Sequence, residues 1–332
     1  MQSEALEFVE SVAYPTFGTI LLGGLSDSRN RIPLHTSAGL AYTGLESKIE
    51  TRTMIYIVKG EPVGYFNRQK MEYSEEYRSP FAVMKEMSLN ILGRFNLNPA
   101  ENSLCFDSEN IGILSGSSDS GAAALGRALI EMNPGGKDID MEKFENRLRV
   151  VSESVGRSLY GGLTITERTG SRCFTRQILS PEAFSDFVVL GCRFNETRKP
   201  SDAIHTNIVK SSEYEARVKR TADKAVEMEK LAKNSKIQEI FELAMHDTDE
   251  YHRLIESVGV KIINKGMAEV INSVNQYRRE SWASYIVTGG TNVFVPVHRS
   301  EYLSLRERLS GLCDEIVPLK IAEGARIIAK SF

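Results

Sequence analysis

Long apolar runs and a surplus of charge are both missing from this chain of 332 residues. No window approaches the roughly 20 apolar residues that a helix needs to cross a bilayer. The acidic start Met-Gln-Ser-Glu-Ala-Leu-Glu differs from the basic, then apolar, start of a secretory signal. Acidic residues (44) nearly balance basic ones (41). We therefore expect a cytoplasmic protein with no membrane contact and no general field that would attract nucleic acid.

Cysteine is scarce and scattered. Cys105, Cys173, Cys192 and Cys313 lie far apart and form no C-x-x-C pair. This spacing indicates neither a zinc site nor a disulfide framework, so we expect four reduced and mostly buried thiols. The chain is nevertheless long enough for a well-buried core divided between two lobes.

A glycine- and serine-rich segment is the most informative feature that is present. It reads Gly112-Ile-Leu-Ser-Gly-Ser-Ser-Asp-Ser-Gly-Ala-Ala-Ala-Leu-Gly126 and leads into an alanine-rich helix. A tight loop before a helix offers unpaired N–H groups and a positive dipole end to a phosphate. The segment lacks the lysine of a P-loop and the glycine spacing of a dinucleotide fingerprint. By itself it also fits a linker or a close contact between helices.

Hydrophobic periodicity predicts a mixed α+β fold. The expected helices span 79–93, 119–132, 140–154, 211–234, 237–257, 261–277 and 303–313. The expected strands span 17–22, 39–42, 48–58, 63–66, 103–106, 111–114, 159–166, 177–179, 187–194, 283–287, 293–297 and 314–319. A new β-rich section begins near residue 187, so we place the boundary between two lobes there, at residues 1–183 and 184–332.

Several polar clusters have an ordinary structural interpretation. The dense mixed charges over 213–233 are typical of an exposed helix face. Asp247, Asp249 and Glu250 lie near His246 and His252, but their mixed helical spacing favours a solvated face over a metal site. A lone histidine, His35, is more often structural than catalytic.

Four segments together resemble one family, the GHMP small-molecule kinases. They are Pro15-Thr-Phe-Gly-Thr-Ile-Leu-Leu-Gly-Gly24, the loop Ser115–Leu125, Ser152-Glu-Ser-Val-Gly-Arg-Ser-Leu-Tyr-Gly-Gly162 and Tyr285-Ile-Val-Thr-Gly-Gly-Thr-Asn292. Within that superfamily they are similar to the diphosphomevalonate decarboxylase branch, and most of all to its archaeal mevalonate 3-kinases. The resemblance implies an N-terminal nucleotide-binding lobe similar to ribosomal protein S5 domain 2. It also implies a ferredoxin-like C-terminal lobe, and it suggests a homodimer.

Three departures from the decarboxylase pattern carry the most information. Thr288 stands where the decarboxylases have an aspartate, and Leu21 where they have a lysine. In the substrate loop their S-G-S becomes Ser152-Glu153-Ser154. A carboxylate at Glu153 would repel a substrate diphosphate and accept a hydrogen bond from a free hydroxyl. These substitutions match the mevalonate 3-kinase pattern.

The resemblance also assigns residues to roles. It implies catalytic roles for Thr288, Glu153 and Arg198, and a substrate pocket that includes these three with Leu21, Ser115, Ser154 and Arg157. The implied ATP-binding residues are Gly112, Ser115, Gly116, Ser117, Ser118, Asp119, Ser120 and Gly121, with Ser117 as the candidate ligand of Mg²⁺. Without the resemblance, Arg157 could pair with Glu153 or a helix end, and Arg198 could be a surface residue.

Asp119 stays ambiguous at this stage. It could favour a metal ion, but an aspartate at a helix N-terminus is commonly a cap, and we favour the cap.

The activity that the resemblance implies is ATP- and Mg²⁺-dependent phosphorylation of the 3-hydroxyl of mevalonate in an archaeal isoprenoid pathway. Phosphoryl transfer asks mainly for positioning and charge stabilisation, so the missing base need not prevent it. Decarboxylation passes through a cation-like centre that an aspartate would stabilise, so we expect the reaction to stop at the 3-phosphate. The alternatives are a decarboxylase of a mevalonate phosphate and a non-catalytic protein that binds nucleotide or mevalonate.

Overall fold

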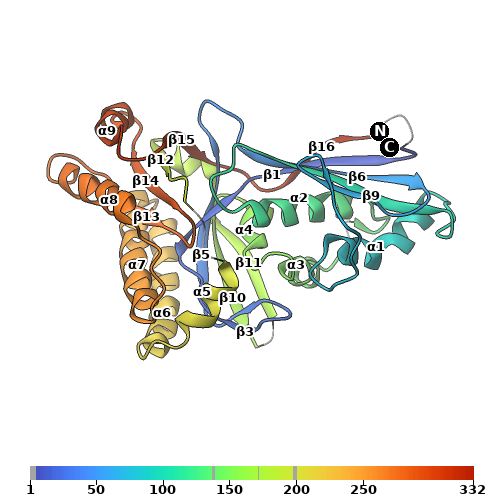
Figure 1. Ribbon diagram of the computed structural model, residues 1–332, viewed down its shortest axis with the longest axis horizontal. Coiled ribbons are helices and arrows are strands. Elements are labelled where there is room, and N and C mark those ends of the chain that lie inside the picture. The colour runs from blue at the N-terminus through green and yellow to red at the C-terminus, as the bar shows by residue number, and fades with distance from the viewer. Residues whose placement is uncertain (1–4, 137–138, 171, 197–199) are drawn as a thin grey trace.

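Two large β-sheets organise the molecule, with helices packed against them (Figure 1). The computed structural model describes residues 5–136, 139–170, 172–196 and 200–332. Helices and strands both contribute many elements, which confirms the predicted α+β class. Among the described residues, none of the helices combines the length and the apolar composition that a bilayer span demands.

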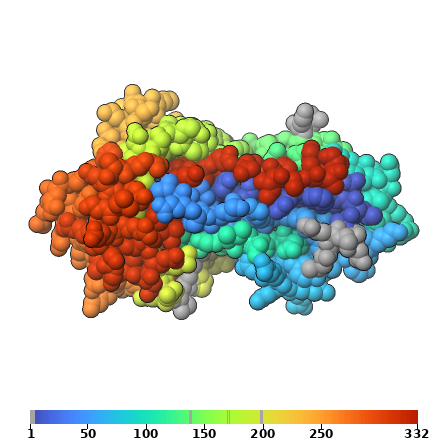
Figure 2. Space-filling model, turned by 90° about the horizontal axis from the view of Figure 1, so that it is seen from above, coloured from blue at the N-terminus to red at the C-terminus, as the bar shows by residue number. Residues whose placement is uncertain are grey.

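The first sheet has six strands and joins the two ends of the chain. Its order is β16 (Arg326–Lys330), β1 (Phe8–Ala13), β6 (Glu50–Lys59), β9 (Asn102–Ile111), β7 (Gly64–Phe66) and β8 (Gln69–Lys70). Figure 2 looks down onto this sheet, where the red C-terminal strand lies along the dark blue N-terminal strand. The C-terminal end of the chain therefore completes a sheet that the N-terminal segment begins.

The second sheet has eight strands and runs through the middle of the molecule. Its order is β11 (Arg172–Leu179), β10 (Leu163–Thr169), β5 (Ser37–Gly44), β15 (Glu315–Ile321), β12 (Phe187–Arg193), β14 (Asn292–His298) and β13 (Ile286–Val287), and β2 (Thr16–Ile20) also pairs with β5. A short hairpin, β3 (Leu25–Asp27) with β4 (Ile32–Pro33), follows β2. Pairing of β15 with β5 makes the sheet continuous between the two halves of the chain. The division at residues 183 and 184 stays a prediction.

The helices cover these sheets in two groups. In the N-terminal half they are α1 (Pro80–Arg94), α2 (Ser117–Met132), α3 (Met141–Arg149), α4 (Val155–Tyr160) and the 3₁₀ helix η3 (Pro181–Phe184). In the C-terminal half they are α5 (Ser201–Ile208), α6 (Tyr214–Lys233), α7 (Ile237–Ser257), α8 (Lys265–Tyr277) and α9 (Tyr302–Leu309). Figure 1 shows α2 lying under the six-stranded sheet, and α6 and α7 packed beside the other one.

Helix α2 is buried because its composition lets it approach the sheet closely. Alanine favours helix, and Ala122, Ala123 and Ala124 are almost fully buried against β1 and β6. Gly126 admits the Leu148 side chain of α3, which would lie 2.3 Å from a Cβ at that position. The N-terminus of α2 is thereby held rigidly where the glycine-rich loop ends.

Three sequence predictions are corrected, and one helix is added to those expected. Residues 111–114 are not a separate strand, because β9 ends at Ile111 and the chain then forms the loop before α2. The helix expected over 140–154 ends at Arg149, where Ser152 turns to donate a hydrogen bond to Asp119. The strand expected over 159–166 begins only at Leu163, after a pair of glycines with positive φ. Helix α5 was not expected at all.

The charged helix faces are also corrected. Arg217 of α6 and Asp247 of α7 are fully buried, whereas the sequence analysis placed both on solvated faces. The charge pattern misled because these two side chains pair with each other across the interface between α6 and α7.

Candidate functional site

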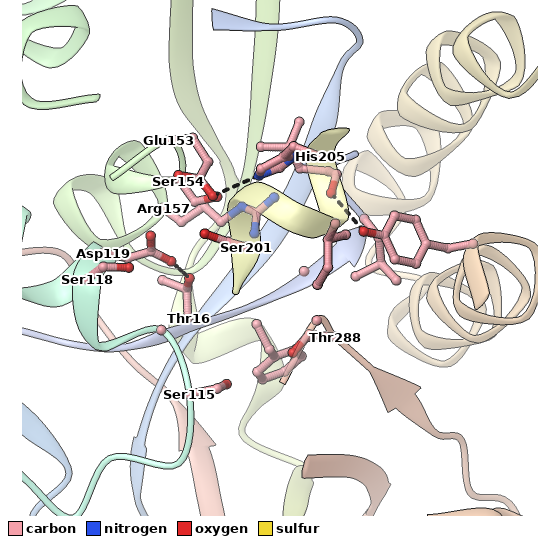
Figure 3. Close-up of a pocket in the computed structure, with 18 residues that line it drawn as sticks. Thr16, Ser115, Ser118, Asp119, Glu153, Ser154, Arg157, Ser201, His205 and Thr288 are labelled. Atoms are coloured by element: carbon pink, nitrogen blue, oxygen red, sulfur yellow. Dashed lines mark hydrogen bonds and ion pairs between the residues drawn. The ribbon is translucent and has the colours of Figure 1, made fainter. Parts of the chain in front are cut away.

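A polar cavity of about 120 Å³ lies where the two halves of the chain meet (Figure 3). Six segments surround it: β2 with the residues after it, the loop before α2 with the start of that helix, the stretch from Glu153 into α4, helix α5, Tyr251 of α7, and the turn after β13. Its lining residues are Thr16, Phe17, Gly18, Leu21, Leu22, Ser115, Gly116, Ser118, Asp119, Glu153, Ser154, Arg157, Ser201, Ile204, His205, Tyr251, Thr288 and Gly289.

The loop before α2 is built to present its backbone to the cavity. Gly116 has φ of 78°, and a Cβ there would lie 2.5 Å from the backbone nitrogen and oxygen of Thr16. The Tyr42 hydroxyl fixes Ser115 by accepting from its N–H (3.0 Å) and donating to its carbonyl (2.7 Å). The Ser115 hydroxyl is buried and has no hydrogen-bond partner among the described residues. The first turn of α2 then offers N–H groups that lack intrahelical acceptors, which suits an anion.

Asp119 does not cap α2, so that interpretation is wrong. The N-cap is Gly116, and no side chain within the described part of the chain makes a capping hydrogen bond to the helix. The Asp119 carboxylate instead accepts hydrogen bonds from the hydroxyls of Thr16 and Ser152. Burial raises the pKa of Asp119, although the charge of Arg157 and the two hydroxyl donors oppose that shift. The two hydroxyls therefore fix the orientation of this carboxylate in the cavity wall.

Arg157 is the exceptional residue of the cavity. Its side chain comes from α4, is 6% exposed and points to the middle of the cavity in Figure 3. Its Nε and Nη2 atoms have no hydrogen-bond partner among the described residues. Burial lowers the pKa of its guanidinium, although the nearby charges of Asp119 and Glu153 oppose the shift. A buried cation without partners is costly, so this arrangement favours binding of an anionic ligand.

The backbone around Arg157 is shaped to admit it. A Cβ on Gly39 of β5 would lie 2.6 Å from Arg157 Cδ and 2.7 Å from its Nε. A Cβ on Gly18 of β2 would lie 3.5 Å from its Nη1. Two adjacent strands therefore carry glycine where the guanidinium passes.

Glu153 does not pair with Arg157, which excludes one alternative from the sequence analysis. It forms a salt bridge with the buried Arg31 (Nη2 to Oε2, 2.8 Å), and its Oε1 lies 3.1 Å from His205 Nε2. The Gly24 N–H donates to His205 Nδ1 (3.2 Å), so the ring proton sits on Nε2 and is donated to Glu153. Burial alone would raise the pKa of Glu153, but His205 and Arg31 outweigh it and hold that pKa well below its usual range.

The remaining predicted substrate residues fall into two groups. Leu21, Ser154 and Thr288 line the cavity, and Thr288 lies near Ser115 on the side away from Glu153 (Figure 3). The Asn292 amide donates to the Leu114 carbonyl (2.9 Å) and ties the turn that carries Thr288 to the loop before α2. Arg198 lies outside the described residues.

A second cavity, of about 320 Å³, lies on the other side of the α2 N-terminus. It is mostly apolar and is lined by Thr53, Phe66, Met71, Pro80, Phe106, Ser108, Ser117, Ser118, Gly121, Ala122, Leu125 and Val151. Ser118 lines both cavities. The two cavities therefore adjoin at the start of α2.

The predicted nucleotide residues divide between these cavities. Ser115, Gly116 and Asp119 line the polar one, Ser117 and Gly121 the apolar one, and Ser118 both. Gly112 and Ser120 line neither. The Ser120 hydroxyl lies 2.6 Å from that of Thr51, and Gly112 accepts a hydrogen bond from Arg193 (3.3 Å).

Sequence reasoning missed Arg31, His205 and Thr16. Arg31 and His205 approach Glu153 from 122 and 52 residues away along the chain, and α5, which carries His205, was not predicted. A signal existed for Thr16 alone, since it stands in one of the four family segments.

Comparison with known families defines the class first. The model of the diphosphomevalonate decarboxylase-like N-terminal domain matches residues 13–175, and that of the mevalonate-3-kinase C-terminal domain matches residues 199–302. The mevalonate diphosphate decarboxylase of Staphylococcus aureus shares the fold, with a TM-score of 0.81 at 17% identity over 97% of this chain and 98% of that one. The fold is thus that of the GHMP small-molecule kinases.

Closer relatives define the family within that class. The mevalonate-3-kinase of Picrophilus torridus is 46% identical over 98% of both chains. That of Thermoplasma acidophilum is 43% identical over 87% of this chain and 88% of its own. A crystal structure of the Thermoplasma enzyme with mevalonate 3-phosphate and ADP has a TM-score of 0.90 at 38% identity, covering 98% of this chain and 99% of that one. This chain belongs to the mevalonate 3-kinase family.

Proposed function

We propose that this protein transfers the γ-phosphoryl group of ATP to the 3-hydroxyl of mevalonate, giving mevalonate 3-phosphate and ADP without decarboxylation. Family membership supports the reaction, and the two adjoining cavities support a two-substrate site. In this proposal the apolar cavity receives the nucleotide base and the polar cavity receives mevalonate. The start of α2 lies between them and receives the phosphates.

The observation that carries the proposal is the buried guanidinium of Arg157 without a partner among the described residues. Mevalonate has a carboxylate, and a guanidinium can bind a carboxylate through two parallel hydrogen bonds. Ser115, whose hydroxyl also lacks a partner there, is placed to contact the same substrate. The cavity is thus prepared for a small hydroxy acid before any ligand enters.

Glu153 gives the proposed site its preference for unphosphorylated mevalonate. The pKa of Glu153 is lowered, so its carboxylate stays charged at neutral pH. The carboxylate lines the cavity, and Arg31 and His205 hold it in place. A primary hydroxyl can donate to this carboxylate, whereas a phosphate in its place would be repelled. The free 5-hydroxyl end of mevalonate is therefore assigned to Glu153.

Thr288 and Leu21 are the reason that the proposed reaction stops at the 3-phosphate. Both line the cavity, and neither can carry a charge. Loss of carbon dioxide would pass through a cation-like centre, which needs a nearby anion for stabilisation. Thr288 can orient the reacting hydroxyl by a hydrogen bond, and Arg198 remains a proposed second cation at the reacting centre.

Mg²⁺ is part of the proposal as a partner of the nucleotide. The described residues contain no group of three His, Cys, Asp or Glu side chains that could hold a metal ion. Mg²⁺ commonly keeps several waters and binds through phosphates with one or two protein oxygens, and we assign Ser117 to that role. The hydroxyl-rich start of α2 fits such an ion, which would neutralise charge on the transferring phosphate.

Incubation with ATP, Mg²⁺ and mevalonate tests the proposal. We expect ADP formation that requires mevalonate, and a ³¹P NMR signal from phosphate attached to a carbon that bears no hydrogen. Release of carbon dioxide would identify a decarboxylase instead. Tight nucleotide binding without turnover would identify a binding protein.

A homodimer, proposed from the family resemblance, a cytoplasmic location, proposed from the missing apolar runs and the acidic start, and the two-lobe division at residues 183 and 184, proposed from the β-rich section that follows, complete the proposal. Sedimentation velocity tests the first of these, with a single species at twice the chain mass of 37.1 kDa as the expected result.

A further inference from the structure

The segment Leu21–Gly24 forms one wall of the polar cavity but has no regular secondary structure. Side chains satisfy six of its main-chain polar groups instead. The partners are Asp247 for Leu21 N–H, Arg217 for Leu21 C=O, Tyr251 for Leu22 C=O, His35 for Gly23 N–H, Tyr214 for Gly23 C=O and His205 for Gly24 N–H. Helices α5, α6 and α7 supply all of these except His35. The wall is thus held by the C-terminal half of the chain.

Two of these side chains form a closed ring around Leu21. Asp247 Oδ2 accepts from the Leu21 N–H (2.7 Å), while Arg217 Nη2 donates to the Leu21 carbonyl (2.8 Å). The two side chains pair with each other through both ends, at 3.1 and 3.0 Å. Both are fully buried. One ion pair therefore fixes both main-chain groups of the residue that replaces the decarboxylase lysine.

The pair belongs to a larger charged cluster that keeps it ionised. Lys224 contacts Asp247 (2.7 Å) and Glu250 (2.6 Å), and Arg220 contacts Glu250 (2.9 Å). Burial alone would raise the pKa of Asp247, but the charges of Arg217 and Lys224 outweigh it and lower that pKa. A buried ion pair is weak evidence for stability, because the cost of removing both charges from water can exceed their attraction. Its presence here calls for a reason other than stability.

Tight packing shows how little freedom the wall has. A Cβ on Gly23 would lie 2.7 Å from Ile208 of α5, and one on Gly24, whose φ is +85°, would lie 2.2 Å from the Tyr214 hydroxyl. Leu21 itself is 4% exposed and faces the cavity. A shift of the Leu21 main chain would therefore displace the wall of the cavity.

We propose that Arg217 and Asp247 are positioning residues that place the Leu21 wall against mevalonate and thereby set the affinity for this substrate. Neither residue lines either cavity, so both act through Leu21. This inference rests on the proposed function. Misplacement of a substrate contact by about 1 Å can cost about a hundredfold in rate, so loss of the ring acts on mevalonate and leaves ATP binding unchanged.

Three variants test the proposal in the full-length chain. Arg217→Lys keeps the positive charge but loses the planar guanidinium, whose two terminal nitrogens bind Asp247 and the Leu21 carbonyl at the same time. The double variant Arg217→Met with Asp247→Leu removes the pair without leaving a lone buried charge. Lys224→Met is the matched control, because Lys224 contacts Asp247 without contacting Leu21. KM and kcat are measured for mevalonate and for ATP separately, together with the midpoint of thermal unfolding.

We expect Arg217→Lys and the double variant to lower kcat/KM for mevalonate by about tenfold or more, with KM for ATP within about twofold of wild type. Lys224→Met is expected to leave both substrates unchanged. If the double variant does not fold, the comparison of Arg217→Lys with Lys224→Met decides. Equal effects of those two variants on mevalonate would overturn the inference. An inactive wild-type protein would instead overturn the proposed function, so the two failures are distinguishable.

Discussion

Two buried arginines, Arg157 and Arg217, are in opposite states although their side chains are almost equally hidden from water. Arg217 is 0% exposed and pairs with Asp247, Glu250 and the Leu21 carbonyl. Arg157 is 6% exposed, and two of its nitrogens have no partner among the described residues. Burial acts to lower the pKa of both, but the charges around Arg217 reverse the shift while those near Arg157 do not. The charge of the first arginine is paired within the fold, although its Nε has no partner among the described residues, whereas the second arginine is left for a ligand.

The two environments serve different purposes, one structural and the other directed to ligand binding. Around Arg217, charged side chains of α6 and α7 complete one another and hold a wall in place. Around Arg157, the strands carry glycine and the nearest carboxylates are engaged elsewhere. An unpaired buried charge lowers stability, and proteins keep such strain chiefly where function requires it.

The largest expected effect comes from replacing each arginine in turn by methionine. Arg157→Met is expected to lower kcat/KM for mevalonate by about a thousandfold, or about 4 kcal/mol, because the carboxylate loses its charged partner. Its unfolding midpoint should match or exceed that of wild type, since a costly buried charge is gone. Arg217→Met should destabilise by about 3–5 kcal/mol, because Asp247 and the Leu21 carbonyl lose a partner.

Steady-state kinetics and calorimetry of both variants measure these effects. A destabilisation of Arg157→Met as large as that of Arg217→Met would show that Arg157 is also satisfied within the fold.

The second prediction concerns pH, through His35. Burial, assisted by the charge of Arg217, lowers the pKa of His35 from about 6.5 to about 4. As pH falls, the unfolded chain takes up this proton first, so stability is present above about pH 6.5 and is lost toward pH 4. The loss amounts to about 3 kcal/mol for this group at most. His252 has the same lowered pKa and adds to the fall.

Urea unfolding of wild type and His35→Gln at several pH values checks this effect. The variant should show a shallower fall of the unfolding free energy between pH 6.5 and 4. Equal slopes would mean that His35 is protonated within the fold.

The third prediction moves Arg157 without removing it. Gly39→Ala places a methyl group 2.6 Å from Arg157 Cδ and 2.8 Å from the Phe17 carbonyl oxygen, so the arginine side chain must shift and the neighbouring strand must also adjust. We expect KM for mevalonate to rise by about tenfold, because the bidentate geometry is lost. Gly93→Ala is the control: nothing lies within 4 Å of its Cβ, and alanine favours the helix. An unchanged KM for mevalonate in Gly39→Ala would argue against Arg157 as the carboxylate ligand.

The smallest expected effect concerns discrimination at Glu153. Glu153→Gln removes the charge that repels a phosphate, so efficiency with mevalonate 5-phosphate relative to mevalonate should rise about fivefold, or about 1 kcal/mol. His205→Gln keeps one acceptor for Gly24 and one donor for Glu153, so it should preserve the wild-type ratio. Competition between the two substrates measures the ratio. A larger rise in His205→Gln than in Glu153→Gln would assign discrimination to the histidine.

Local pattern predicted much of the secondary structure and part of the site. The helix over 237–257 was predicted with the bounds of α7, and the start of α2 was missed by two residues. Of the cavity residues, Leu21, Ser115, Glu153, Arg157 and Thr288 are predicted by the family resemblance, because each stands in one of the four segments that carry it.

Local sequence pattern could not predict which side chains form hydrogen bonds or ion pairs with the buried polar residues. Asp119 was interpreted as a cap because an aspartate near a helix start usually is one. Its real partners, Thr16 and Ser152, are 103 and 33 residues away. The charged side chains of α6 and α7 were interpreted as exposed to solvent for the same reason, because their partners are distant along the chain. The side chain that satisfies Arg217 lies 30 residues further along the chain, on another helix.

The sequence by itself determined the α+β class, the glycine- and serine-rich loop before α2 and, through the family resemblance, the uncharged residues Leu21 and Thr288 where the decarboxylases carry charges. These depend on residue identity and local periodicity, which can be read along the chain. The tertiary structure alone decided which buried charge is paired and which is not. The energy of a buried charge depends on the groups that surround it in space, and here those groups come from distant parts of the chain.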